Sequence, residues 1–82
     1  MMDVLYFAWV RERIGLPKER IDTTPATVMD LVNQLRAREE RYEAAFADLN
    51  ALRVAVDQEL SDFNAPLAGA REVAFFPPMT GG

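Results

Sequence analysis

Apolar residues in the first part of the chain have the composition and spacing of β-strands. The run from Asp3 to Val10 is rich in β-branched and aromatic side chains and is broken by the charged residues 11–13. It therefore predicts a first strand that is apolar on both faces. Residues 18–23 are short, polar and alternating, and they follow Gly15 and Pro17. This pattern predicts an antiparallel return strand that a long turn joins to the first.

The next segment has the spacing of a helix that packs on a sheet. Its apolar residues fall at i, i+3, i+4 and i+7: Val28, Leu31, Val32 and Leu35. Thr27 precedes them as a candidate N-cap, with Asp30 three residues later. A shorter second helix is predicted by the same spacing in the residues that follow the charged run 36–41: Tyr42, Ala45, Phe46 and Leu49.

Two more strands are predicted at 51–60 and 71–76, on either side of a loop at 61–70 that contains Asn, Pro and Gly. The first and last strands are apolar on both faces, which favours adjacent central strands that run parallel after a helical crossover. The predicted class is α+β, with the β-grasp (ubiquitin-like) fold. In it, one main helix and a short second helix pack on one face of a mixed sheet. We expect a domain at 1–76 and an extended tail at 77–82.

This arrangement leaves one face of the sheet without helices, and that face should carry an apolar patch. Strand alternation offers two sets from the first strand, together with residues 73 and 75 or 74 and 76: Val4, Tyr6 and Ala8, or Leu5, Phe7 and Trp9. Exposed apolar patches of this kind mark protein interfaces. In a chain this small, however, Phe7 and Trp9 taken singly are more often core residues, so the prediction concerns the summed patch.

Composition narrows the chemistry that the chain can perform. The 82 residues contain no cysteine and no histidine. This excludes thiolate sites, the usual zinc ligands and the commonest general base, so we expect no metal site and no cofactor bound by this chain. The net charge of −4 argues against nucleic acids and anionic membranes and favours a basic protein partner. The first apolar run is too short to cross a bilayer, so we expect a cytoplasmic protein.

The C-terminal stretch EVAFFPPMTGG, residues 72–82, suggests a reactive tail. Pro77 and Pro78 fix φ near −65° and cannot continue a sheet, so they favour a stiff, extended stalk. Six residues at about 3.3 Å each reach roughly 20 Å, enough to enter the active site of a partner. Gly81 and Gly82 add no bulk. The terminal carboxylate of Gly82 is therefore the best candidate for the reactive group.

Three segments resemble one family over nearly the full length: VLYFAWVRE near the start, VAVDQE in the middle and the ending EVAFFPPMTGG. They are similar to the MoaD family, the small sulfur-carrying subunits of molybdopterin synthase. The combined FFPP-x-[TS]-GG ending is the specific part of the resemblance. The resemblance implies a small subunit of a sulfurtransferase that contributes no catalytic side chain of its own and assembles with two large subunits and a second small subunit.

The resemblance also implies how the tail is used. An activating enzyme of the ubiquitin-activating kind would use ATP to adenylate Gly82, and a sulfur donor protein would convert the adenylate to a thiocarboxylate. The tail would then enter the large subunit and give its sulfur to cyclic pyranopterin monophosphate. Residues that would thread into the partners are Met79, Thr80 and Gly81, and those that would dock on them are Phe7, Phe75, Pro77 and Pro78.

Two other functions stay open from the sequence. The chain could be a sulfur carrier of the thiamine pathway, or a ubiquitin-like modifier conjugated through Gly82. One position departs from the family pattern, because many members have Val-Asn-Gln where this chain has Asp57 between Val56 and Gln58. A carboxylate cannot donate a hydrogen bond as an amide can, so the contacts of this position need to be seen.

Overall fold

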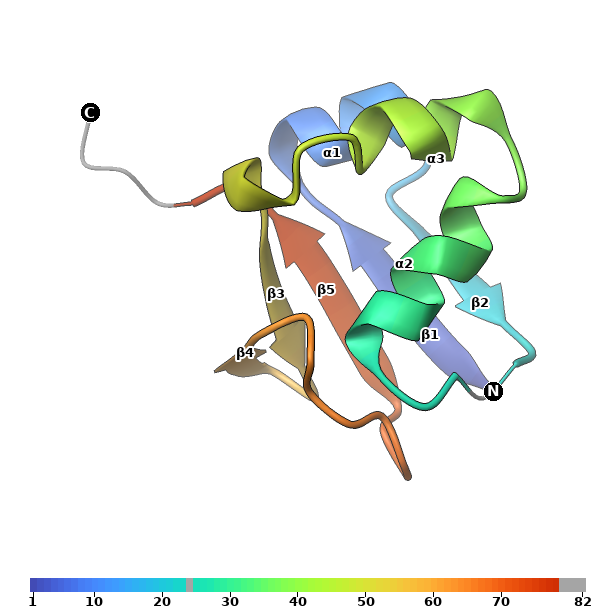
Figure 1. Cartoon of the computed structure of the whole chain (residues 1–82), viewed down its shortest axis with the longest axis vertical. Helices are drawn as coiled ribbons and strands as arrows, with labels where there is room; N and C mark the ends of the chain where they lie inside the picture. Colours follow the sequence, from blue (N-terminus) through green and yellow to red (C-terminus); the bar gives the residue numbers. More distant parts are fainter. Residues whose placement is uncertain (24, 79–82) are drawn as a thin grey trace.

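The computed structural model describes residues 1–23 and 25–78. Its centre is a five-stranded sheet with the order β2-β1-β5-β3-β4. The strands are β1 (Met2–Tyr6), β2 (Lys18–Ile21), β3 (Arg53–Val56), β4 (Glu59–Ser61) and β5 (Glu72–Phe76). The helices are α1 (Ala8–Ile14), α2 (Val28–Arg36), α3 (Glu40–Ala45) and the 3-10 turn η1 (Leu49–Ala51). The helices gather on one face of the sheet (Figure 1), which gives the predicted β-grasp fold.

The central strands are paired as the sequence predicts. β1 and β5 run parallel, whereas β2 pairs antiparallel with β1 and β3 pairs antiparallel with β5. The core lies between the sheet and the helices. Its fully buried side chains include Val4 and Tyr6 of β1 and Val73 and Phe75 of β5. Strand alternation therefore places Leu5, with Ala74 and Phe76, on the helix-free face.

The main helix begins where its N-cap signal predicts. The backbone N–H of Asp30 donates to Thr27 Oγ1 at 3.2 Å, which satisfies one of the free donors of the first turn. The four predicted apolar positions of α2 are all buried. The second helix is also confirmed, because Tyr42 and Ala45 of α3 are buried. Leu49, which was predicted to continue that helix, begins η1 instead.

The first strand is shorter than predicted. It ends at Tyr6, and the chain turns at Ala8, whose φ is +53°, into α1. Ala8 and Trp9 therefore lie in a helix and are not part of the sheet. The physical reason is burial, because Val10 and Ile14 are four residues apart and both point into the core from one face of α1. The predicted long turn between the first two strands contains this helix.

The predicted strand 51–60 is a hairpin. β3 ends at Val56 and β4 starts at Glu59, with a two-residue turn between them. Asp57 and Gln58 have φ of 49° and 70°, the left-handed pair that closes tight hairpins. Apolar residues keep an even spacing on both sides of the turn, at Val54, Val56 and Leu60, and the turn contains no glycine. The sequence pattern therefore did not predict the reversal.

Candidate functional site: the base of the C-terminal tail

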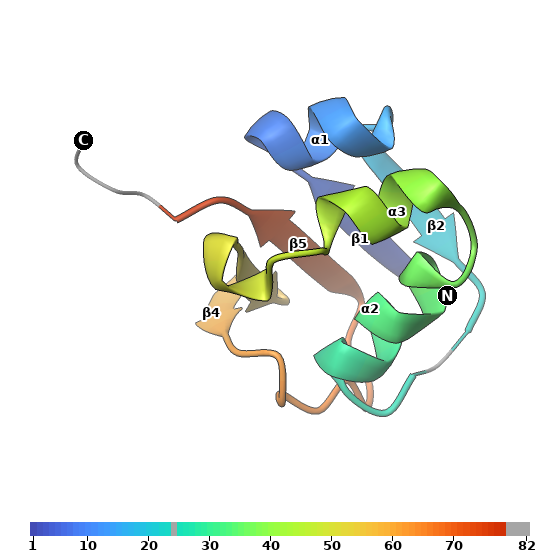
Figure 2. The same cartoon turned by 45° about the horizontal axis from the view of Figure 1, so that its top comes forward.

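The tail leaves the domain from the middle of the sheet. β5 lies between β1 and β3, and Pro77 and Pro78 follow it directly. β1 and β5 are parallel and end at the same edge, away from the N-terminus (Figure 2). The four residues predicted to thread into partners, Met79, Thr80, Gly81 and Gly82, lie outside the described residues. The described part of the site is therefore the platform from which the tail departs.

Phe75 anchors the tail to the core. Its side chain is 0% exposed. The ring packs edge-on against Phe46, with 5.0 Å between centroids, and lies nearly parallel to Tyr6, with 6.3 Å between centroids. Such burial contradicts the docking role predicted for Phe75, since a side chain inside the core cannot contact a partner. Instead, Phe75 fixes the strand immediately before the two prolines.

The next residue, Phe76, is the one that faces outward. It is half-buried on the helix-free face, as the alternation of β5 requires. Phe7, predicted as a docking residue, is 45% exposed. The backbone N–H of Phe7 donates to the carbonyl of Phe75 at 3.1 Å, so the backbones of the two segments meet at the tail base. Sequence reasoning offered Phe76 as one alternative for the apolar patch but did not name it among the docking residues, because alternation alone leaves open which face the helices cover.

The helix-free face has an apolar row that crosses four of the five strands. Its members are cross-strand neighbours, one each from β1, β5, β3 and β4: Leu5, Ala74, Ala55 and Leu60. Lys18 of β2 pairs with Leu5 and ends the row with a charged side chain. Leu60 is 74% exposed, and together with Phe7 it is one of the most exposed large apolar residues in the described part of the chain. We call this row, with Phe7 and Phe76 on its tail side, the outer face. The apolar patch predicted for the helix-free face is therefore present.

A polar cluster on the core side braces the strand beside the tail. Both buried phenols, Tyr6 of β1 and Tyr42 of α3, donate to the same oxygen, Oε2 of Glu19, at 2.8 and 2.6 Å. Arg38 donates to the other oxygen, Oε1, at 3.2 Å. The carboxylate of Glu19 therefore ties β1, β2 and α3 together. Since Tyr6 packs on Phe75, the cluster also supports the anchor of the tail.

The electrostatics of this cluster follow from its burial. Burial by itself would raise the pKa of Glu19, but the hydrogen bonds from Tyr42 and Tyr6 and the charge of Arg38 outweigh it and hold that pKa below the usual value. Burial, then the contact with Glu19, raises the pKa of Tyr42 to about 12. The pKa of Tyr6 is raised further for the same reasons. The cluster therefore holds one carboxylate and two neutral phenols at neutral pH.

The side chain of Asp57, the position that departs from the family pattern, acts only as an acceptor. Its Oδ1 receives the backbone N–H groups of Arg71, at 2.9 Å, and Glu72, at 3.0 Å. These bonds join the hairpin turn to the start of β5. An asparagine amide oxygen could make the same two contacts, so the change from Asn to Asp keeps the acceptor that this turn uses.

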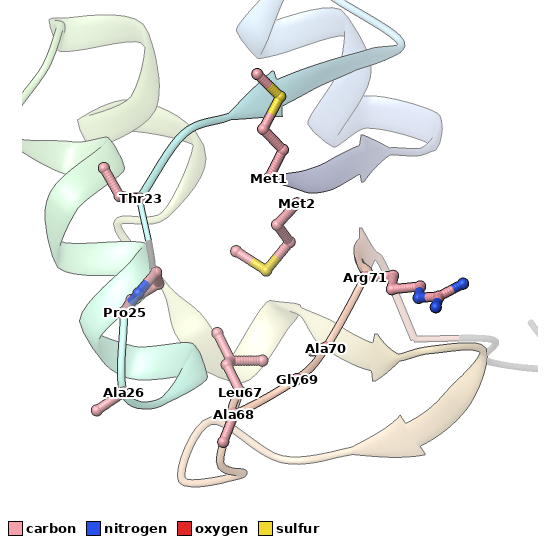
Figure 3. A pocket seen from close by; sticks show the side chains of 10 residues that line it. All are labelled: Met1, Met2, Thr23, Pro25, Ala26, Leu67, Ala68, Gly69, Ala70 and Arg71. Carbon is pink, nitrogen blue, oxygen red and sulfur yellow. The ribbon is translucent and has the colours of Figure 1, made fainter.

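One hollow lies at the opposite end of the sheet from the base of the tail. It has a volume of about 590 Å³ and is lined by the N-terminal methionines and by residues 23, 25–26 and 67–71. Figure 3 shows Met2 and Leu67 pointing toward each other across it, whereas the guanidinium of Arg71 points away. Of the predicted site residues that the structure describes, none lines this hollow. Its described lining contains no carboxylate and is mainly apolar.

The described residues also offer few groups for other chemistry. Among residues 1–23 and 25–78 there is no cluster of three or more carboxylate side chains placed to hold a metal ion. No helix in that part of the chain is long and apolar enough to cross a membrane. The site is therefore a firmly held strand end, an apolar outer face beside it and the tail that follows.

Comparison with known proteins gives a consistent result. Residues 4–82 match the ThiS family. The molybdopterin synthase sulfur carrier subunit of Escherichia coli K12 is 42% identical over 82 residues, which is 100% of both chains. The protein with the same name from Haemophilus influenzae is 33% identical, again over 100% of both. The crystal structure of SAMP1 from Haloferax volcanii superposes with a TM-score of 0.77 at 26% identity, and it covers 99% of this chain and 98% of its own.

Proposed function

The chain belongs to the ThiS family, and on that premise we propose that it is the sulfur carrier subunit of molybdopterin synthase, in molybdenum cofactor biosynthesis. The full-length identity of 42% to a protein of that name carries the proposal. It favours the molybdenum pathway over the thiamine pathway that the sequence left open. A small subunit of this enzyme requires a large subunit as its partner, and the chain takes part in catalysis through that complex.

The reacting group in this proposal is the carboxylate of Gly82. Its oxygen attacks the α-phosphorus of ATP in an activating enzyme, so that pyrophosphate leaves and an acyl adenylate forms. The outer sulfur of a persulfide on a donor protein then attacks the acyl carbon, and AMP leaves. A second thiol cleaves the resulting acyl disulfide, so that the donor sulfur ends in a disulfide with that thiol and Gly82 carries the thiocarboxylate. Inside the large subunit the sulfur passes to cyclic pyranopterin monophosphate, and a water oxygen restores the carboxylate. The absence of cysteine and histidine from the sequence supports a terminal, not a side-chain, carrier.

The geometry of the tail base supports delivery of such a group. Pro77 and Pro78 follow a strand that is hydrogen-bonded on both sides and anchored by Phe75 in the core. The direction in which the tail leaves is thereby fixed relative to the outer face. A partner that covers Phe7 and Phe76 receives the tail at a defined position, which reduces the entropy lost when the terminal group is placed.

The outer face is the surface that we propose for docking. It is apolar, next to the tail and free of helices, so both the large subunit and the activating enzyme would cover Phe7, Phe76 and Leu60, in turn and not together. Two small and two large subunits form the complete enzyme in this proposal, and the reaction takes place in the cytoplasm.

Intact-mass measurement on the chain purified from its native cells tests the chemistry. The thiocarboxylate form is expected to appear with the mass change of one oxygen replaced by sulfur. A variant with one alanine added after Gly82 should fold but form no molybdopterin with large subunit and precursor. A matched variant with alanine added before Met1, which is 75% exposed, should remain active. Full activity of the C-terminal extension would contradict the proposal, and an isopeptide-linked product in place of the thiocarboxylate would favour a protein modifier.

A further inference from the structure

Three cations border the outer face on the side of the tail: Arg11 of α1, Lys18 of β2 and Arg53 of β3. Within the part of the chain that the structure describes, none of the three forms an ion pair with a carboxylate. We propose that the large subunit docks on the outer face with an apolar anchor flanked by carboxylates that pair with this basic rim. This inference rests on the proposed function and adds the chemical nature of the partner surface.

A hollow next to Phe7 lies between two cations of the rim, Arg11 and Lys18. It has a volume of about 370 Å³ and is lined by Leu5, Tyr6, Phe7, Arg11, Pro17 and Lys18. Lys18 and Leu5 are cross-strand partners, so Lys18 adds a positive charge at the end of the apolar row. Among the described residues, no carboxylate lines the hollow. An apolar side chain from a partner would contact Leu5, Phe7 and Pro17 in this hollow. A carboxylate next to that side chain would then lie near Arg11 or Lys18.

Arg53 completes the rim on the other side of the tail. It is the cross-strand neighbour of Phe76 on the outer face. Its Nη1 donates to the carbonyls of Leu52, at 2.8 Å, and Asn50, at 3.2 Å. These contacts hold the guanidinium in place, while within residues 1–23 and 25–78 no carboxylate neutralises it. A partner carboxylate that reaches Arg53 would therefore meet an already positioned donor.

Most of the other cations are paired, and the two that form no ion pair within the described residues, Arg13 and Arg71, do not line the hollow beside Phe7. Arg20, Arg36, Arg38 and Arg41 each pair with a carboxylate. On the outer face, the row farther from the tail contains Asp3 and Glu72 as neighbours. The net charge of −4 predicted a basic partner. The tail side of the docking face, however, carries positive charges, so it favours an acidic surface on the partner. Charges at the edge of an interface govern encounter and orientation, so the local rim determines which surface can dock.

Two charge-reversal pairs test the rim. The rim pair is Arg11→Glu with Lys18→Glu. The control pair is Arg13→Glu with Arg71→Glu, which changes the net charge equally. Arg13 lies over the ring of Trp9 on α1, and Arg71 precedes β5 at the far end of the sheet. Neither control residue lines the hollow. Arg11→Gln with Lys18→Gln removes the charge without reversing it, and thermal unfolding checks that every variant is folded.

Association with the purified large subunit is measured by stopped flow at several salt concentrations. The rim pair should slow association by about tenfold or more at low salt, and the control pair should change it by less than about threefold. The neutral pair should give an intermediate rate, and the difference should shrink as salt rises. Equal slowing by both reversal pairs, or faster association of the rim pair, would overturn the inference. Failure of the unaltered chain to bind the large subunit would instead contradict the proposed function, and the rim proposal with it.

Discussion

Replacing Glu19 by alanine tests whether the tail base depends on the polar cluster behind it. The substitution removes the single acceptor that Tyr6 and Tyr42 share. Both tyrosines are almost completely buried, at 1% and 0% exposure. Their hydroxyl groups would therefore lose their partner without gaining access to bulk water, and buried donors without partners are costly.

The magnitude follows from these contacts. Each buried, unsatisfied hydroxyl costs about 1–3 kcal/mol. The Glu19 side chain is 13% exposed, so water can reach part of the space that it leaves. The total should therefore lie in the lower half of the summed range of about 2–6 kcal/mol, at about 3 kcal/mol. The ion pair with Arg38 adds little, because that arginine side chain is 48% exposed. For a domain of this size, the loss corresponds to a decrease in Tm of about 12–24 °C.

Urea unfolding of four proteins separates the lost acceptor from other effects. Glu19→Ala is measured in the unaltered chain and in a Tyr6→Phe, Tyr42→Phe background, where no phenol hydroxyl remains to be left unpaired. There the same substitution should cost about 1 kcal/mol or less, which gives a coupling energy of about 2 kcal/mol. Equal costs in the two backgrounds, or a cost in the unaltered chain below about 1 kcal/mol, would refute the reasoning.

Three further predictions concern the same platform. The lowered pKa of Glu19 means that its contribution is complete above the pKa of an unfolded glutamate, about 4.3, and is lost as pH falls through the lower folded value. The difference in urea stability between the chain and Glu19→Gln should therefore shrink from about pH 5 to pH 3 and should not grow. Asp57→Ala should cost about 2 kcal/mol in urea unfolding by removing two hydrogen bonds and placing Ala at positive φ. Asp57→Asn should stay within about 0.5 kcal/mol, and a large loss there would contradict the acceptor role. Phe75→Ala should cost about 3–5 kcal/mol. Phe76→Ala should change stability by less than about 1 kcal/mol yet weaken binding to the large subunit at least tenfold in calorimetry, and unchanged binding would exclude Phe76 from the docking face.

Local sequence signals predicted those elements whose stabilising contacts are close in the chain. The helix at Val28–Arg36 has its N-cap, Thr27, and its apolar stripe within nine residues. The last strand has strong β-formers and ends at two prolines. Parallel pairing of β1 and β5 also followed from the sequence, because both runs are apolar on two faces and are joined through helices.

The errors concern residues whose conformation depends on distant contacts. The apolar run through Trp9 and Val10 matches a strand by composition, but the core accepts Val10 and Ile14 only from a helix that folds back after Ala8. The turn at Asp57 and Gln58 is held by the backbone of residues 71 and 72, which are more than ten positions away. Neither the burial of Val10 and Ile14 nor the bonds to residues 71 and 72 can be predicted from the residues next to them in the sequence.

The sequence by itself determined the fold class, the two prolines that follow the last strand and the absence of thiol and imidazole groups, because composition, periodicity and proline act locally. Only the tertiary structure decided which aromatic side chain at the tail base is anchor and which is surface. Phe75 and Phe76 are chemically identical neighbours, and alternation places them on opposite faces without saying which face the helices cover. The helices cover the face of Phe75, because Tyr6 and Phe46 pack against it there. That packing leaves Phe76 on the outer face beside the basic rim.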